Sequence, residues 1–406
     1  MDKSSQSSQS TQSTHPAAST ISRPNLQQGV NSRSLKTSRI STRVKHVAKS
    51  LFGSPFNALC TLTFIWILIQ LYPPLIDWAY TNAVFVADPQ ACQDARGSGA
   101  CWGVVKEKYA AILWGRYPYA QQWRAQLATL LLLVLILRST VCATTSGLKR
   151  AHALEWVGVL IIIFILMSGY LGPVEFLRSS VITPLLGKPF PVVTTDLWGG
   201  LPLTLILSFV CIVLATPLAL VLALGRVSEI ALFRVLSKTY IEIVRGVPLI
   251  SVLFMASYMF PLLLPSGYSP DVLIRVIAGI SLFAAAYLAE IIRAGIQAVP
   301  ESQTEAARSI GLNYWQTQYL VILPQAVKIV IPGMMNSFIA IFKDTSLITI
   351  VSLYELTGSL SLAMNGDALW RPFKLEGYLF ITLIYFVFCF AMSRYSLWLE
   401  HRLSRT

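Results

Sequence analysis

Long apolar stretches recur along this chain and constrain its fold more than any other feature. A helix needs about 18 or more apolar residues to cross the roughly 30 Å hydrocarbon core of a bilayer. The composition agrees, since 54% of the residues are hydrophobic and only 13% are charged, where a soluble domain has about a quarter charged. The sequence therefore predicts an all-α polytopic membrane protein.

We expect about eight transmembrane helices, with the N-terminus in the cytoplasm. Starting from that side, the tail, the second, fourth and sixth loops and the C-terminus hold most of the 32 lysine and arginine residues. This bias is typical of cytoplasmic segments. The expected spans cover residues 56–76, 124–143, 154–172, 201–224, 248–264, 273–294, 328–351 and 377–398.

The net charge of +13 does not indicate a nucleic-acid partner. The basic residues lie at the ends of the apolar runs, where they orient a protein in its membrane. Residues 1–49 are rich in Ser, Gln and Thr and have no apolar core of the kind a signal peptide needs. This composition predicts a disordered basic cytoplasmic tail held near anionic membrane lipid.

The remaining chain divides into an accessory region, 50–190, and a working region, 191–406. The first holds three spans and a long outer loop, and the second holds the helix breakers and charges at membrane depth. In the outer loop, Cys92 and Cys101 can form a local disulfide if that compartment is oxidising, or remain thiols. The four histidines lack metal-ligand spacing, so no metal site is expected.

A polar segment at 300–324 interrupts the apolar pattern. Ser302 and Glu305 have capping-box spacing, Gly311 suits a left-handed C-terminal cap, and Asn313 can cap a second helix that stops near Leu323-Pro324. We expect two short rigid helices joined at the glycine, with a small face at Ala306 and Ala307 that another surface can approach. An amphipathic helix lying on the headgroups is the alternative.

This segment carries a specific resemblance. EAARSIGLNYWQTQYLVILP resembles the EAA loop of ABC importer permeases, and it meets every fixed position of that motif, namely Glu305, Ala306, Ala307, Gly311, Val321, Leu323 and Pro324. The resemblance implies a five-helix type I importer permease core in the C-terminal region. It also implies that the loop forms a coupling helix, which docks in a groove of a cytoplasmic ATPase.

Further segments narrow the resemblance. EIVRGVPLI, AAYLAEIIRAGIQAVPESQ and FKDTSLITIVSLYEL are similar to the polar amino acid permeases of the histidine and glutamine type, although Val247 stands where threonine is common. The long N-terminal half is similar to the larger permease of general L-amino acid uptake systems in Gram-negative and cyanobacterial cells. Amino acids are therefore the implied substrate class.

The same resemblance implies the partners. The chain contains no G-x-x-x-x-G-K-[ST] pattern, so we expect it to bind no cofactor and to catalyse no reaction itself. ATP and Mg²⁺ would be held by a partner ATPase dimer. A second, homologous permease chain would complete a heterodimer, and a periplasmic amino-acid-binding protein would deliver substrate at the bacterial inner membrane.

Charged and polar residues within the spans are candidates for the substrate path or its gate. Lys343 and Asp344 have either that role or a structural one, in which they contact a neighbour carrying Glu290 or Arg293. Asn336 follows an expected helix break at Pro332-Gly333, where unwound backbone can bind a zwitterion.

Arg245, the last candidate, is either an exposed partner of Glu242 or a brace for the lateral helix that leads into the coupling loop. An ion-coupled secondary carrier is the alternative function, with Lys343, Asp344 or Glu290 as the relay. A carrier needs no ATPase, so it leaves the polar segment at 300–324 unexplained.

Overall fold

The computed structural model describes residues 50–145, 150–170, 190–265 and 268–403. The predicted disordered tail, 1–49, lies outside these ranges. The described residues are helical, with two isolated bridges, Val84–Cys101 and Gly200–Glu355, and no longer strand. The predicted all-α class is confirmed.

Packing divides the chain into two units, Met1–Leu75 and Ile76–Thr406. The first contains nearly all of α2 (Pro55–Ile76), which continues as a π turn, η1 (Asp77–Thr81). The expected boundaries at 49 and 190 do not coincide with this division and stay a prediction.

Six helical segments among the described residues are long and apolar enough to cross a membrane. A seventh is counted if α10 (Ala231–Arg245) is taken with the helix that follows Pro248, although a bend of 103° separates them. The span expected at 154–172 is present as α6 (Arg150–Ser168), but its apolar part, Leu154–Ser168, is shorter than a full crossing. The six cover Pro55–Thr81, Tyr119–Val141, Gly200–Val227, Val272–Ala298, Tyr314–Val351 and Arg371–Leu403.

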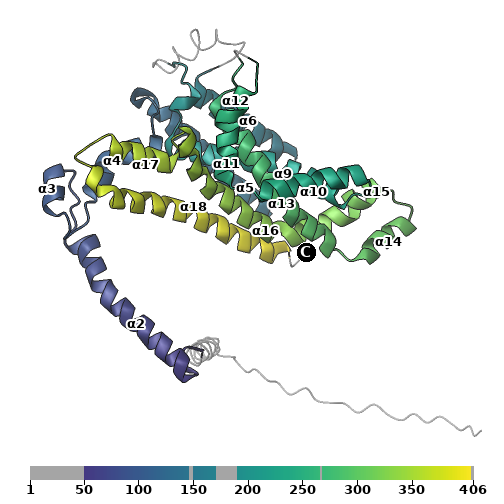
Figure 1. The fold of residues 1–406 in the computed structure, drawn as a ribbon, viewed down its shortest axis with the longest axis horizontal. Coiled ribbons are helices and arrows are strands. Elements are labelled where there is room, and N and C mark those ends of the chain that lie inside the picture. Colours follow the sequence, from purple (N-terminus) through teal and green to yellow (C-terminus); the bar gives the residue numbers. More distant parts are fainter. Residues whose placement is uncertain (1–49, 146–149, 171–189, 266–267, 404–406) are drawn as a thin grey trace, which may run out of the picture. The chain divides into compact units, whose positions relative to one another are not determined.

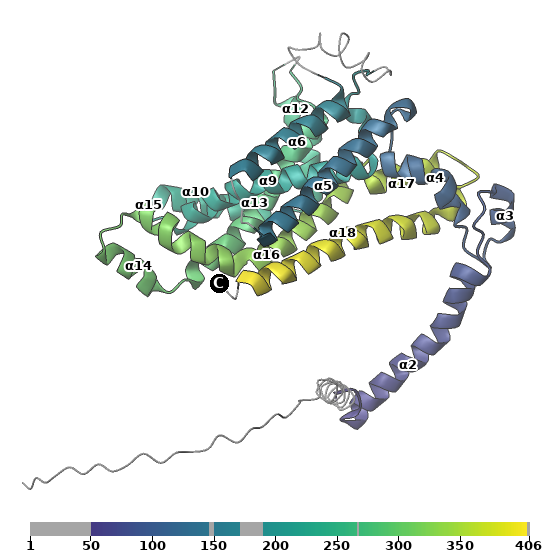
Figure 2. The ribbon, with the colours of Figure 1, turned by 180° about the vertical axis from the view of Figure 1, so that it is seen from behind.

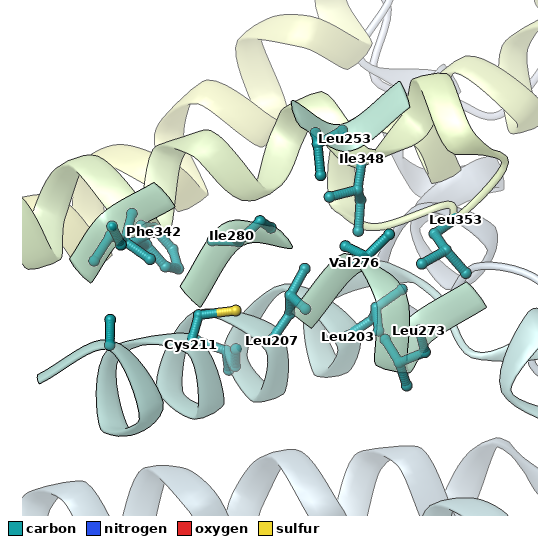
Figure 3. Close-up of a cluster of buried hydrophobic side chains, with 14 of the residues drawn as sticks. Leu203, Leu207, Cys211, Leu253, Leu273, Val276, Ile280, Phe342, Ile348 and Leu353 are labelled. Atoms are coloured by element: carbon teal, nitrogen blue, oxygen red, sulfur yellow. The ribbon is translucent and has the colours of Figure 1, made fainter. Parts of the chain in front are cut away.

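The core of the second unit is the contact between α9 (Gly200–Val227) and α13 (Val272–Ala298). Small buried residues let the two backbones approach, with Ala215, Ala219 and Ala223 recurring every four residues along α9. Figure 3 shows the larger apolar side chains that fill the remaining space between these helices and their neighbours.

The helix α16 (Leu323–Asp344) packs on the other side of α13. It runs without interruption through Pro332 and Gly333, so the expected helix break at this pair is wrong. A proline removes only one helical hydrogen bond, which packing on neighbouring helices can offset within a membrane protein. Gly333 serves close approach instead, because a Cβ there would lie 3.1 Å from Ile291 Cγ2 on α13.

Between α10 and α13 the chain forms α11 (Leu249–Phe254), a π turn η6 (Met255–Met259) and α12 (Phe260–Leu262). After α16, a 3-10 helix η8 (Thr345–Val351) leads to α17 (Leu356–Asn365), a second 3-10 turn η9 (Arg371–Phe373) and α18 (Lys374–Leu403). Both views place α10 near the segment that follows α13, at one end of the unit (Figure 1 and Figure 2).

The helices α5 (Gln122–Thr145) and α6 pack on each other, and α5 also packs on α9. The indole of Trp156 on α6 stacks on Phe209 of α9, with ring centroids 4.4 Å apart. On α5 the guanidinium of Arg124 is buried, lies 4.1 Å from the ring centroid of Phe190 and donates to the carbonyls of Leu166 and Pro191. The hydrogen bond from Arg124 to Leu166 therefore joins α5, the second expected span, to α6, the third.

The outer loop folds into α3 (Pro89–Asp94), α4 (Gly103–Trp114) and a 3-10 turn η2 (Tyr119–Gln121). α4 lies beside α17 (Figure 2). Lys108 Nζ forms an ion pair with Asp367 Oδ2 at 2.7 Å, and this contact holds the pKa of Asp367 below its usual range. The loop is therefore a folded cover on the C-terminal helices.

Candidate functional site

The polar segment begins with α14 (Glu301–Ser309), which starts directly after Pro300. Ser302 lies inside this helix, so the capping box expected between Ser302 and Glu305 is not formed. Pro300 has extended dihedral angles, and the helix begins at Glu301, two residues earlier than a cap at Ser302 requires. Glu301 in the first turn and Arg308 in the last turn have charges that stabilise the helix dipole.

The expected glycine joint is confirmed. Gly311 has a φ of +85°, a conformation that L side chains rarely adopt. The amide of Leu312 donates to the carbonyl of Ala307 at 3.1 Å, and the amide of Gly311 donates to that of Arg308 at 3.0 Å. This pattern satisfies the last carbonyls of α14.

Asn313 caps the next helix as expected. Its side-chain oxygen accepts from the amide of Gln316 at 2.9 Å, and the Gln316 side chain accepts from the amide of Asn313 at the same distance. This helix, α15 (Tyr314–Gln316), does not stop at Leu323-Pro324. It continues as a π turn, η7 (Thr317–Ile322), into α16. Pro324, which has no N–H group, lies at the start of α16 just after the π turn, where the changed hydrogen-bond pattern accommodates it.

The expected pair of short helices is therefore corrected to one short helix followed by a long one. α14 stands apart, and α15, η7 and α16 form one continuous helical segment. A displacement of α14 would act on the end of a membrane-spanning helix rather than on a loop.

The two alanines of the motif lie on different faces of α14. Ala307 is buried, whereas Ala306 and Glu305 are exposed, so only part of the expected small face is open to another surface. Among the described residues, two polar side-chain contacts join α14 to other segments of the chain. Arg308 forms an ion pair with Glu229 at 3.3 Å, and Gln325 Nε2 donates to Gln303 Oε1 at 3.3 Å.

Glu290 on α13 gathers three arginines. Arg293 on the same helix donates to it, Arg226 at the end of α9 lies 3.0 Å away, and Arg245 at the end of α10 lies 4.0 Å away. The Arg245 guanidinium also lies over the ring of Tyr287, 5.4 Å from its centroid. The interpretation of Arg245 as a partner of Glu242 is wrong, and its contacts fit a brace between α10 and α13.

Asp344 lines a cavity of about 330 Å³ between α11, α13 and α16. Ser337, Ala340 and Ile341 line it from the same face of α16, as their spacing of three to four residues requires. Asn336 and Lys343 are exposed and lie outside this lining. Among the described residues, neither Lys343 nor Asp344 forms an ion pair with Glu290 or Arg293, and those two pair with each other.

The sequence reasoning missed Glu355, whose carboxylate is fully buried between η8 and α17. Its Oε1 accepts from the amides of Thr357 and Gly358, both at 2.9 Å, and its Oε2 accepts from the Tyr385 hydroxyl at 2.7 Å. Burial raises the pKa of Glu355, against these hydrogen bonds, which lower it. The sequence signal was an acidic residue directly before a helix, the usual position of a capping side chain.

Cys92 and Cys101 form a disulfide in the structure. Both are buried against α17 and the segment that leads into α18. The amide of Cys101 donates to the buried Glu376 at 2.9 Å, which joins the disulfide to α18.

Known proteins are similar to this chain in sequence. Residues 215–405 match the family described as binding-protein-dependent transport system inner membrane component. The chain is 44% identical over 356 residues to the inner membrane amino-acid ABC transporter permease protein YhdY of Escherichia coli strain K12, covering 88% of this chain and 92% of that protein.

A second relative extends over a similar length. The glutamate/glutamine/aspartate/asparagine transport system permease protein BztC of Rhodobacter capsulatus is 36% identical, covering 89% of this chain and 94% of that protein. A solved amino acid ABC transporter with histidines is 32% identical, with a TM-score of 0.45, over 50% of this chain and 92% of its own. Both alignments therefore extend well beyond the C-terminal half of the chain.

Proposed function

The chain belongs to the family of binding-protein-dependent transport system inner membrane components and is a permease subunit of an ABC transporter, and we propose that it carries amino acids into the cell. The geometry of α14 supports this proposal most directly. The helix is stopped by a left-handed glycine and followed by a capped helix that continues into the membrane. It presents Glu305 and Ala306 to solvent.

We propose that α14 docks on a cytoplasmic ATPase dimer, which binds ATP and Mg²⁺. Closure of the two ATPases would push α14, and the continuous segment from Tyr314 to Val351 would carry that displacement to the cavity beside Asp344. A rigid connection suits this task because a flexible loop would absorb the movement.

We propose that substrate passes beside α16, between this chain and a second, homologous permease. Asp344 would attract the ammonium group of an amino acid to the cavity. Asn336 and Lys343 lie on the exposed face of the same helix, where the second permease chain would pack. A periplasmic amino-acid-binding protein would deliver the substrate, and the N-terminus would lie in the cytoplasm of a cell with an inner membrane.

The test is co-purification followed by uptake in reconstituted vesicles. We expect an ATPase to be isolated with the tagged chain, and we expect Glu305→Lys and Gly311→Arg to remove both that ATPase and ATP-driven amino acid uptake. Glu107→Lys is the matched control, because Glu107 is exposed on α4 in the outer loop. Full uptake by this chain alone, driven by an ion gradient, would refute the importer and favour a secondary carrier.

A further inference from the structure

Two neighbouring cavities lie where α9, α10 and α15 meet. One, of about 480 Å³, is lined mainly by apolar side chains, which include Val221, Leu224, Phe233 and Trp315. The other, of about 550 Å³, is lined by four arginines, Arg226, Arg234, Arg293 and Arg308. Ser228, Glu229 and Tyr314 line both cavities, so the two cavities adjoin.

The charge of the second cavity is positive on balance. Glu229 and Glu301 are the acidic residues in its lining, against four arginines. Arg226 and Arg293 are held by Glu290. Arg308 forms a pair with Glu229 at 3.3 Å, in which both side chains are more than half exposed. Arg234 donates to the backbone carbonyl of Glu229 at 3.0 Å and has no carboxylate partner among the described residues.

The apolar cavity lies at the end of a candidate membrane span. Val221 is 68% exposed on α9, a candidate span that ends at Val227, and Phe233 and Trp315 are also more than half exposed. Apolar side chains left this open at the end of a span are stabilised by contact with acyl chains, whereas water would disfavour them. Arg226 and Arg293 lie near the ends of the candidate spans α9 and α13, and Arg234 and Arg308 lie beyond those ends. This is the level expected for lipid headgroups.

We propose that this double cavity binds an anionic phospholipid. Its phosphate would lie between Arg234 and Arg308, and the start of one acyl chain would lie along Val221, Leu224 and Phe233. The apolar half of the site favours a lipid over a free phosphate, because a small anion would leave that half empty. The positive half favours an anionic headgroup over a zwitterionic one.

A lipid at this position would link the coupling helix to the membrane. Arg308 belongs to α14, whereas Arg234 belongs to α10. A phosphate held by both would therefore fix α14 to α10. The orientation of α14 would then depend on anionic lipid in that leaflet.

The test measures lipid binding rather than transport. The full chain is purified in detergent, stripped of lipid and titrated with phosphatidylglycerol, and bound lipid is counted by native mass spectrometry. We expect phosphatidylcholine to bind much more weakly. The double variant Arg234→Gln/Arg308→Gln should weaken phosphatidylglycerol binding by about fivefold for each charge removed, and Arg234→Lys/Arg308→Lys should restore most of it.

Two further variants separate the sources of the anion. Val221→Trp fills the apolar half and should weaken lipid binding while leaving the binding of inorganic phosphate unchanged. Arg138→Gln is the matched control, since Arg138 is exposed on α5 and pairs with Glu155 at 2.9 Å, away from both cavities. Retention of each variant's elution volume and Tm shows that the fold is kept.

Three results would overturn the proposal. The first is equal binding of phosphatidylcholine and phosphatidylglycerol. The second is inorganic phosphate binding as tightly as the lipid with no effect of Val221→Trp, which would indicate a site for a free anion. The third is loss of bound phosphatidylglycerol when the complete transporter assembles, which would assign the double cavity to a protein partner.

Discussion

The Nη1 atom of Arg226 lies 3.0 Å from the Oε2 atom of Glu290 and joins the end of α9 to the last third of α13. The two atoms form an ion pair without hydrogen-bond alignment. Arg293 adds hydrogen bonds to the same carboxylate, and Arg245 reaches it from α10 at 4.0 Å. One carboxylate thus balances charges from α9, α10 and α13.

Replacement of Glu290 by Gln should destabilise the protein by about 1–3 kcal/mol, because three partly buried guanidinium groups lose their shared carboxylate. The measurement is thermal unfolding of the purified chain in detergent. Glu242→Gln is the matched control, since Glu242 is about half exposed and its arginine and lysine partners lie 3.7 and 4.0 Å away. An equal change in Tm for the two variants would show that the Glu290 cluster has no special role.

Replacement of Glu355 by Ala should destabilise the protein by about 2–4 kcal/mol, because the buried amides of Thr357 and Gly358 lose their acceptor. Glu355→Gln should cost less, since its amide oxygen can accept from both amides and its NH₂ group can donate to the Tyr385 hydroxyl. Denaturation of the three proteins side by side checks this order. A Gln variant as unstable as the Ala variant would mean that the negative charge itself is required.

The stability of the protein should fall with rising pH through the titration of Glu355. Burial raises the pKa of Glu355 above its ordinary 4.5, so between these two values the native state binds more protons than the unfolded state. The contribution is therefore greatest below pH about 4.5 and is lost as pH rises through the raised native pKa. The difference in Tm between wild type and Glu355→Gln should shrink as pH rises, and an increase would show that the pKa is lowered instead.

The sequence predicted the fold class and the local structure around Gly311 and Asn313 because both depend on local chemistry. Apolar length predicts spans, and a glycine and an asparagine at the right spacing predict the joint at Gly311 and the cap at Asn313. The effect of prolines was harder to predict. Pro300 starts α14 before Ser302 can cap it, and Pro324 and Pro332 are accommodated by a π turn and by packing rather than ending a helix.

Long-range contacts were not predictable from one sequence. Arg245 is three residues from Glu242 but binds a carboxylate 45 positions away along the chain, a partner that only the packing of α10 on α13 provides. The hydrogen bond that Tyr385 donates to Glu355 is also long-range, since the two residues are 30 positions apart along the chain. Asn336 and Asp344 lie on different faces of α16. Which of the two lines the cavity depends on where α13 packs.

Loss of the disulfide should loosen the outer cover. The bond between Cys92 and Cys101 closes a loop over a separation of nine residues, and a loop of that length contributes about 2–3 kcal/mol. Cys92→Ser/Cys101→Ser should lower Tm and make α4 more accessible to protease, whereas Cys60→Ser, at an exposed free cysteine, should not. An unchanged Tm on reduction of the wild type would show that burial alone holds the cover.

Enlargement of Gly295 should separate α13 from α16. A Cβ there would lie 2.1 Å from Val330 Cγ1 and 3.1 Å from the carbonyl oxygen of Ala326. Gly295→Ala should therefore destabilise the protein by about 1–3 kcal/mol through overpacking. Gly158→Ala is the matched control, because a Cβ at that helical position meets nothing within 4 Å, so the substitution should be neutral or mildly stabilising.

If the α13–α16 contact transmits the movement of the coupling segment, Val330→Ala should restore both Tm and ATP-driven uptake to Gly295→Ala, since it removes the atom that the new methyl group meets. Recovery of Tm without uptake would place the transmission elsewhere.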